Sequence, residues 1–132
     1  MADTQSAGSD LAVVLASGSP RRRELLTQLG LEFAVVVPNI DESVRPGEQP
    51  RAYVGRLAQE KAAAVVQRVG DGPLVIAADT TVALGDRILG KPADRREAAE
   101  MLALLSGHKH VVLSGVALKF GSRIEHAISC TE

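Results

Sequence analysis

The stretch that most constrains the fold is residues 11–23, where an apolar run passes through a short polar turn into a helical pattern. The run from Leu11 to Ala16 is bounded by turn residues, which is typical of a strand buried on both faces. Ser19 is a favourable N-cap, and Pro20 suits the first position of a helix. The sequence therefore predicts a buried strand, a tight loop and a helix that Ser19 opens.

The predicted loop carries groups that suit phosphate. A helix N-terminus offers free backbone N–H groups and the positive end of the helix dipole. Ser17, Ser19, Arg21 and Arg22 add hydroxyl and guanidinium donors at that end. The alternative is a capped surface helix with solvated arginines, which is the commoner outcome for an arginine run considered alone. Residues elsewhere in the chain must decide between the two.

The segments that follow predict an α/β fold. Leu25, Leu26 and Leu29 lie on one side of the first helix, and Gly30 is a natural C-cap. Residues 33–37 are β-branched and apolar, so they predict a second strand and complete a right-handed strand–helix–strand unit. A long helix is expected over residues 50–69, strands over 74–78, 87–89 and 123–128, and an apolar extended pattern that resumes over 82–84.

A third helix is expected to begin at Asp94, which has capping-box spacing with Glu97. Its predicted buried face consists of Ala98, Met101, Leu102 and Leu105, and Gly107 closes it. Residues 111–119 predict a further strand that Ser114-Gly115 interrupts. We assign this helix a structural role and no chemistry.

The composition of the chain argues against several classes of function. The chain has 132 residues, which suits one domain, and 2% aromatic residues, so its core must be aliphatic. Few aromatics and a net charge of −1 argue against nucleic-acid binding. The single cysteine, Cys130, cannot form an internal disulfide. No apolar run has membrane-spanning length, and residues 1–10 lack a signal-peptide pattern, so we expect a cytoplasmic protein with a flexible N-terminal tail over residues 1–10.

Two charged residues break otherwise apolar patterns. Lys61 falls inside the helical stripe formed by Val54, Ala58 and Val65. Such a lysine either extends to the surface, which is commoner, or points its ammonium into a cleft. Asp79 interrupts an apolar extended run, where an unpaired charge is rarely buried. A structural cap on the neighbouring threonines is the alternative to a functional role for Asp79.

Three further residues are candidates for the same chemistry. Asp41 and Glu42 directly follow the second predicted strand, where they either lie near the first loop or form a solvated acidic turn. Lys91 follows a glycine and is either a point-charge ligand for phosphate or an exposed turn lysine. Residues 85–92 nearly match a P-loop, but Pro92 replaces the hydroxyl that would bind Mg²⁺, so we reject a P-loop kinase or ATPase.

Together these residues suit a polyphosphate with a divalent metal. Cations hold phosphate oxygens, whereas carboxylates hold Mg²⁺ and orient water for attack on phosphorus. The four cations are Arg21, Arg22, Lys61 and Lys91, and the three carboxylates are Asp41, Glu42 and Asp79. The residues alone predict phosphate handling and no more.

Five short motifs, in order along the chain, resemble the Maf proteins, also called septum formation inhibitors or Maf/Ham1-like nucleotide pyrophosphatases. They are residues 15–26, Ile40-Asp41-Glu42, residues 57–62, Ala78-Asp79-Thr80 and Leu89-Gly90-Lys91-Pro92. Each motif alone is weak, whereas five in order are specific. The resemblance implies hydrolysis of nucleoside triphosphates to the monophosphate and pyrophosphate, for nucleotide-pool house-cleaning, with a proposed link to septum formation and division arrest. The Asp79-Thr80 pair resembles the branch that acts on dTTP and UTP.

The resemblance also implies roles for individual residues. Asp79 would act as general base or metal-bound activator of water, with Lys61 and Glu42 completing the catalytic set. The implied metal is Mg²⁺, with Mn²⁺ or Co²⁺ as alternatives, held by Asp79 and Glu42. The implied substrate-binding residues are Ser17, Ser19, Arg21, Arg22, Lys91 and Thr80.

The implied fold is a mixed twisted sheet flanked by helices, with two lobes around a deep nucleotide cleft. Residues 11–132 would form this domain without the C-terminal third of the family. The implied partner is a nucleoside triphosphate, with neither nucleic acid nor membrane, and homodimers are common. The alternative function is a truncated, non-catalytic protein that binds nucleotides or regulates division.

Overall fold

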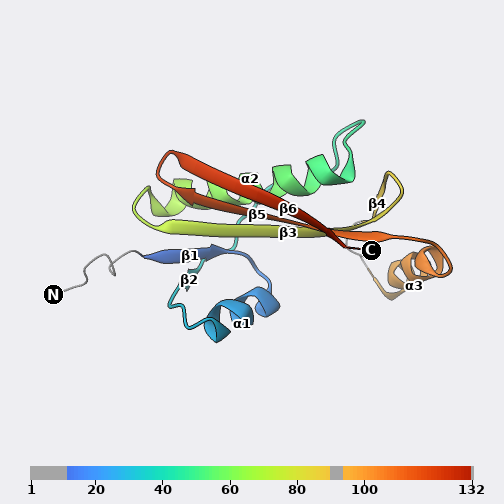
Figure 1. Cartoon of the computed structure of the whole chain (residues 1–132), viewed down its shortest axis with the longest axis horizontal. Coiled ribbons are helices and arrows are strands. Elements are labelled where there is room, and N and C mark those ends of the chain that lie inside the picture. The colour runs from blue at the N-terminus through green and yellow to red at the C-terminus, as the bar shows by residue number, and fades with distance from the viewer. Residues whose placement is uncertain (1–11, 90–93, 132) are drawn as a thin grey trace.

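A six-stranded mixed sheet is the centre of the computed structural model, which describes residues 12–89 and 94–131 (Figure 1). In those ranges the elements are β1 (Val13–Ala16), α1 (Pro20–Gln28), β2 (Ala34–Val35), α2 (Pro50–Val69), β3 (Leu74–Leu84), β4 (Arg87–Leu89), α3 (Arg95–Leu105), β5 (Val111–Phe120) and β6 (Arg123–Thr131). The strand order is β2-β1-β3-β5-β6, and β4 pairs with β3 outside this path. The predicted mixed sheet flanked by helices is confirmed.

Strand β3 organises the sheet because it changes neighbours along its length. Its first four residues pair in parallel with β1, and the last of these pairs joins Ala16 to Ala77. Antiparallel pairing with β5 continues from Leu74 to Ala83, and β4 joins β3 at residues 82–84. Strand β3 therefore extends past the carboxyl end of its parallel neighbour, and the extension carries Asp79 and Thr80.

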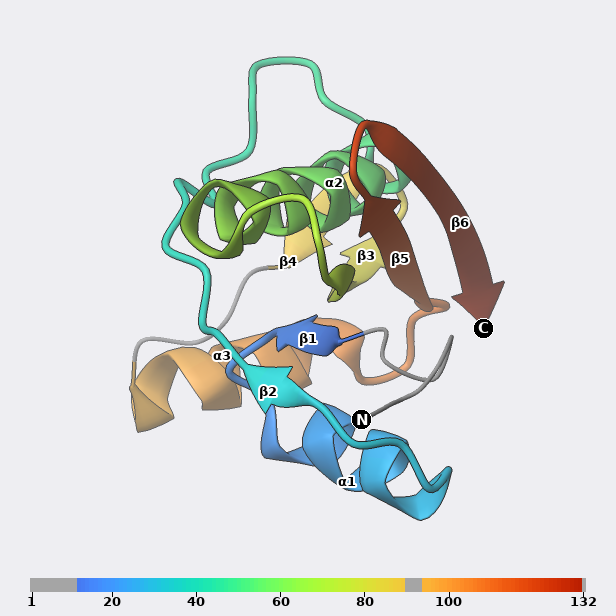
Figure 2. The same ribbon diagram turned by 90° about the vertical axis from the view of Figure 1, so that its left-hand side faces the viewer.

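The core lies between α2 and one face of the sheet. Helix α2 contacts β1, β3, β5 and β6, and Figure 2 shows it lying across the sheet on the side opposite α1. Residues 75, 77, 79, 81 and 83 of β3 are buried and alternate with more exposed ones, so one face of the strand is turned towards α2. Ala58, Ala62 and Val65 of α2 pack there against Val75 and Ala77, giving the aliphatic core that the composition predicts.

Strand β5 is continuous, so the predicted interruption at Ser114-Gly115 is wrong. Gly115 pairs with Asp79 on one side and with Ile128 on the other. A Cβ atom at this position would lie 2.8 Å from the carbonyl oxygen of Val54 in α2. Glycine is present here because the helix backbone approaches the strand, and not because the strand breaks.

Helices α1 and α3 contain no buried residue. Leu25 of α1 and Leu29, which directly follows α1, are 54% and 73% exposed, and Leu102 of α3 is 69% exposed. The predicted buried face of α3 is therefore wrong at Leu102, while Ala98, Met101 and Leu105 are half-buried. Both helices flank the sheet at its margins, α1 beside β1 and β2 and α3 beside β4, so no described layer covers their outer sides (Figure 1).

The predicted helix starts are confirmed. Ser19 Oγ accepts a hydrogen bond from the Arg22 backbone N–H, and Asp94 Oδ1 accepts one from Glu97 at 2.9 Å. Helix α2 has the predicted bounds, and Gly70 follows it. Strand β2 covers two of the five predicted residues and pairs in parallel with β1. The predicted tail over residues 1–10, Leu11, and the P-loop-like residues 90–92, Lys91 among them, lie outside the described residues.

Candidate active site

The site forms where the segments that follow β1 and β2 meet the extension of β3. Ser17 comes directly after β1, and Glu42 lies on the segment between β2 and α2. Asp79 is two residues beyond Ala77, the last partner of β1. The carboxyl ends of parallel strands are where open α/β sheets place their ligands.

Lys61, Asp79 and Glu42 form one group, termed here the lysine–carboxylate group. The Lys61 ammonium donates a 2.8 Å hydrogen bond to Asp79 Oδ1 and lies 4.0 Å from Glu42 Oε2. Lys61 is 8% exposed and Asp79 is 7% exposed. Lys61 therefore does not extend to the surface, because the face of β3 that α2 covers presents a carboxylate to it.

This buried ion pair explains both anomalies in the sequence. A lysine in an apolar stripe and an aspartate in an apolar strand neutralise each other across the helix–sheet interface. Removing one partner of such a pair leaves an uncompensated buried charge, which costs about 3–5 kcal/mol. Asp79 Oδ2 makes no hydrogen bond to any described residue. One oxygen of the carboxylate is thus fixed by Lys61, and the other remains an acceptor.

Ser17, Arg22 and Thr80 form a second group, the arginine–hydroxyl group. The Arg22 guanidinium donates to Ser17 Oγ at 3.3 Å through Nη1 and to Thr80 Oγ1 at 3.1 Å through Nη2. Ser17 Oγ also accepts the Ser19 backbone N–H at 3.0 Å. Thr80 Oγ1 lies 3.3 Å from Ser114 Oγ of β5. These contacts hold Arg22 across the first loop, so its guanidinium is not a freely solvated group.

The two groups lie on opposite faces of β3. Consecutive strand residues point to opposite sides of a sheet, so Asp79 faces α2 while Thr80 faces the α1 side. The backbone between Asp79 and Thr80 therefore connects the lysine–carboxylate group with the arginine–hydroxyl group.

Arg21 belongs to neither group. Its side chain is exposed and makes no hydrogen bond or ion pair with the described residues. Together with Ser19, Glu24 and Leu25 it lines an open hollow of about 640 Å³ on the surface of α1. Of the predicted substrate-binding residues, the structure brings together Ser17, Ser19, Arg22 and Thr80 and leaves Arg21 apart.

The carboxylates of Asp79 and Glu42 could supply some of the ligands of a metal ion whose other ligands come from water and from the substrate. Among the described residues, no group of three or more His, Cys, Asp or Glu side chains could hold a metal ion. Asp79 and Glu42, however, both face the Lys61 ammonium, which shows that two carboxylates converge on one cationic position. Mg²⁺ is commonly bound by one or two carboxylates, with water and phosphate oxygens as its remaining ligands. The residues present fit that pattern.

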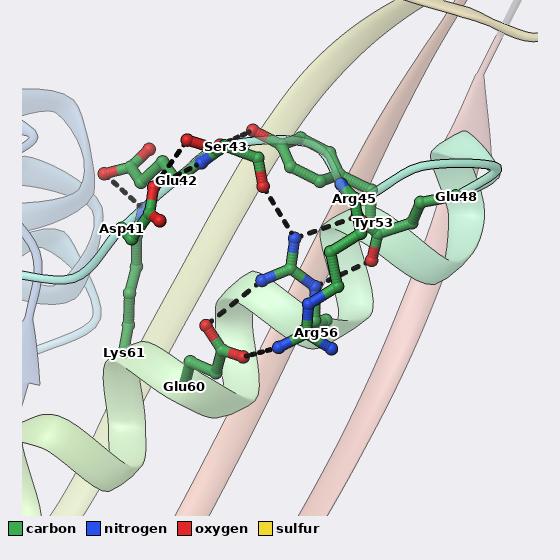
Figure 3. Close-up of polar contacts among 9 residues, drawn as sticks. All are labelled: Asp41, Glu42, Ser43, Arg45, Glu48, Tyr53, Arg56, Glu60 and Lys61. Atoms are coloured by element: carbon green, nitrogen blue, oxygen red, sulfur yellow. Dashed lines mark hydrogen bonds and ion pairs between the residues drawn. The ribbon is translucent and has the colours of Figure 1, made fainter.

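The segment that carries Glu42 is bonded to α2, as Figure 3 shows. Asp41 Oδ1 accepts both the backbone N–H and the hydroxyl of Ser43, and these hydrogen bonds lower the Asp41 pKa. Tyr53 donates its hydroxyl to the Glu42 carbonyl at 2.6 Å. Arg56 bonds Glu48 twice, at 2.7 and 2.8 Å, and holds the pKa of that carboxyl at about 2. Asp41 thus shapes the turn, while Glu42 faces Lys61.

Sequence reasoning missed Tyr53, Arg56 and Ser114. Tyr53 is the one tyrosine of the chain, and Arg56 lies three residues further along the same helix. That spacing places two polar side chains on neighbouring turns beside the apolar stripe, and this signal was available. Ser114 gave no such signal, because its contact with Thr80 depends on the register between β3 and β5.

The described helices include none that is long and apolar enough to cross a lipid bilayer.

Comparison with known proteins decides the family. The family model described as Maf-like protein matches residues 12–132. This chain belongs to the Maf-like family. It is 55% identical over 115 residues to a dTTP/UTP pyrophosphatase of Cereibacter sphaeroides, covering 86% of this chain and 59% of the relative. It is 58% identical over 106 residues to a dTTP/UTP pyrophosphatase of Myxococcus xanthus, covering 80% and 54% respectively. This Maf-like chain therefore spans little more than half the length of these curated relatives.

Two solved structures share the fold of this chain. A nucleoside-triphosphatase, or dITP/XTP pyrophosphatase, of Mycobacterium abscessus superposes with a TM-score of 0.57 at 20% identity, covering 91% of this chain and 72% of that one. The Ham1 protein of Staphylococcus aureus gives a TM-score of 0.52 at 11% identity, covering 90% and 70%. At these identities the likeness establishes the fold of the Maf-like chain and nothing finer.

Proposed function

We propose that this chain catalyses the hydrolysis of a nucleoside triphosphate to a nucleoside monophosphate and pyrophosphate. The observation that carries the proposal is the buried Lys61–Asp79 pair, placed where β3 extends past the end of β1. A paired lysine and aspartate at this position offer a cation for phosphate and a carboxylate for water. The pyrophosphatase names of the curated relatives support the same reaction.

In the proposed reaction, the oxygen of a water molecule forms a bond to the α-phosphorus of the nucleotide, and the bond between that phosphorus and the oxygen that bridges to the β-phosphorus breaks. Asp79 Oδ2, which accepts no hydrogen bond from a described residue, takes the proton of the water. Pyrophosphate leaves with the bridging oxygen. Lys61 keeps Asp79 oriented and offsets the negative charge that develops on the phosphate oxygens.

The arginine–hydroxyl group and Lys91 supply the other phosphate contacts in this proposal. Arg22 is held by Ser17 and Thr80, so its guanidinium is oriented before substrate arrives. Arg21 and Ser19 line the adjacent hollow on α1 and extend the cationic surface outward. This arrangement supports phosphate binding at the first loop, and the proposed nucleotide cleft between two lobes would lie where that loop meets the extension of β3.

Asp79 and Glu42 would hold the divalent metal, with Mg²⁺ first and Mn²⁺ or Co²⁺ as alternatives. When bound, such an ion polarises a phosphoryl oxygen and lowers the pKa of a coordinated water. Removal of free metal with EDTA is expected to abolish turnover, and added Mg²⁺ is expected to restore it.

The proposed substrates are dTTP and UTP, which are named for the curated relatives. The proposed setting is the cytoplasm, where the chain would act on the free nucleotide pool, with a proposed link to septum formation. The net charge of −1 supports a mononucleotide in preference to nucleic acid. A homodimer is part of the proposal, and sedimentation analysis measures it directly.

The test is product analysis with a panel of canonical and modified nucleotides in the presence of Mg²⁺. Release of pyrophosphate and monophosphate, greatest with dTTP and UTP, is the expected result. Release of orthophosphate would indicate a different reaction class. If the folded protein binds nucleotides but forms no product, the proposed hydrolysis is wrong, and the chain is instead a nucleotide-binding or division-regulating protein.

A further inference from the structure

The segment that carries Glu42 is fixed through its backbone by two side chains of α2. Tyr53 Oη donates to the carbonyl oxygen of Glu42 at 2.6 Å. Arg56 Nη2 donates to the carbonyl oxygen of Ser43 at 2.9 Å. We call Tyr53 and Arg56 the clamp, because together they hold two consecutive carbonyl groups against one helix.

The clamp is itself well supported. Arg56 makes two hydrogen bonds to Glu48 and one to Glu60 at 3.2 Å, and its guanidinium lies 5.6 Å from the centre of the Tyr53 ring (Figure 3). A planar guanidinium that makes several bonds in fixed directions has little freedom to move. Tyr53 is buried at its ring, so its hydroxyl is presented from a fixed position.

The Glu42 side chain depends on this support. The Glu42 side chain is 45% exposed, and its Oε2 lies 4.0 Å from the Lys61 ammonium, a long separation for an ion pair. Neither burial nor a short hydrogen bond to Lys61 fixes the carboxylate. The placement of its backbone therefore determines how far the carboxylate lies from Lys61 and Asp79.

We propose that Tyr53 and Arg56 are positioning residues that hold Glu42 in reach of the lysine–carboxylate group during nucleotide hydrolysis. The inference rests on the proposed function. Neither residue touches the reacting atoms, and both act through the backbone of residues 42 and 43. A displacement of about 1 Å at a catalytic group lowers turnover by as much as about 100-fold, so a clamp at this place has a measurable effect.

The clamp holds over the whole physiological pH range. Burial raises the pKa of Tyr53, so its hydroxyl remains a donor at neutral pH. The Glu48 carboxyl raises the pKa of Arg56, which stays charged. The clamp therefore acts as a constant support and not as a pH switch.

The decisive variant is Tyr53→Phe, because it removes one hydroxyl and keeps the ring. We expect kcat for pyrophosphate release to fall about tenfold, with KM changed less than about twofold. The matched control is Arg45→Lys, which changes an arginine of the same segment whose side chain bonds Glu60 and neither clamped carbonyl. That control is expected to keep the wild-type rate.

A double-mutant cycle separates positioning from general structural damage. In the Glu42→Gln background, Tyr53→Phe is expected to cause little further loss, since the clamp acts through Glu42. An equal loss in both backgrounds, or no loss in either, would overturn the inference. Arg56→Lys keeps the positive charge but loses the planar guanidinium that bonds several acceptors at once. It is expected to reduce kcat in the wild-type background and to have little further effect in the Glu42→Gln background.

Amide hydrogen exchange tests the clamp without activity. Tyr53→Phe is expected to speed exchange over residues 42–48, and Arg45→Lys is not. If the wild-type chain releases no pyrophosphate, the proposed function fails, while the exchange result still shows whether the clamp exists. Unchanged exchange in Tyr53→Phe would overturn the clamp itself.

Discussion

Helix α2 differs from α1 and α3 in what its apolar stripe contacts. All three segments have helical spacing of apolar residues, yet α2 contains nine buried residues whereas α1 and α3 contain none. Helix α2 lies across the sheet, while the other two lie at its margins (Figure 2). An amphipathic pattern therefore predicts the helix but not the depth at which it is buried, because burial depends on the sheet face that it meets.

The same difference separates the charged residues. Helix α2 carries Lys61 inside its buried stripe, where Asp79 neutralises it. Helix α1 carries Arg21 and Arg23 at its surface. A charge in α2 is therefore part of the core, whereas Arg21 and Arg23 of α1 can change without disturbing the core.

The largest predicted effect is on core packing. Leu57→Ala in α2 is expected to lower the free energy of unfolding by about 2–5 kcal/mol, because Leu57 is fully buried. Leu29→Ala, at the exposed C-cap of α1, is the matched control and is expected to change this free energy by less than about 0.5 kcal/mol. Urea unfolding measures both, and equal losses would contradict the distinction between the helices.

The next effect concerns the close approach of α2 to β5. Gly115→Ala is expected to lower the free energy of unfolding by about 1–3 kcal/mol, because its Cβ would meet the backbone of Val54. Gly55→Ala instead meets the end of the Ile128 side chain at 3.0 Å, and alanine favours the helix. We expect Gly55→Ala to stay within about 1 kcal/mol of wild type, and a larger loss there than at Gly115 would contradict the proposed geometry.

The long helix, the strand–loop–helix start and the β3–β4 turn were predictable, because each is determined by local signals such as Pro50, Gly70 and Gly85. The depth at which each helix is buried was not predictable, since the apolar spacing of Leu102 in α3 matches that of a buried position. The sequence identified Lys61 and Asp79 as anomalies, but their pairing depends on α2 crossing β3. The clamp was missed for the same reason, because Tyr53 and Arg56 act on a segment that folds back over their helix.

A smaller effect is expected from pH, through the Glu48–Arg56 pair. The Glu48 pKa is about 2 in the folded chain and 4.5 ordinarily, so its stabilising contribution is present above pH 4.5. That contribution is lost as pH falls from 4.5 through 2. Glu48→Gln is expected to be less stable than wild type at pH 7 and to lose less stability between pH 7 and pH 3, as measured by urea unfolding. Identical pH profiles for the two proteins would count against this ion pair.

The smallest effects are expected at the helix caps. Ser19→Ala and Asp94→Ala each remove one cap and are expected to cost about 1 kcal/mol or less. Because α1 and α3 contribute no fully buried residue, the loss is expected as faster amide exchange within each helix, with core exchange in α2 unchanged. Faster exchange in α2 would show that the marginal helices are coupled to the core after all.

The central claim is that Asp79, held by Lys61, activates the water that releases pyrophosphate. The most direct measurement is the rate of pyrophosphate release from dTTP by the wild type, by Asp79→Asn, and by Asp71→Asn, which changes an exposed residue that precedes β3. With folding of each protein verified by circular dichroism, we expect Asp79→Asn to lose at least about 100-fold in kcat and Asp71→Asn to match the wild type. A folded Asp79→Asn variant that releases pyrophosphate at the wild-type rate would contradict the claim.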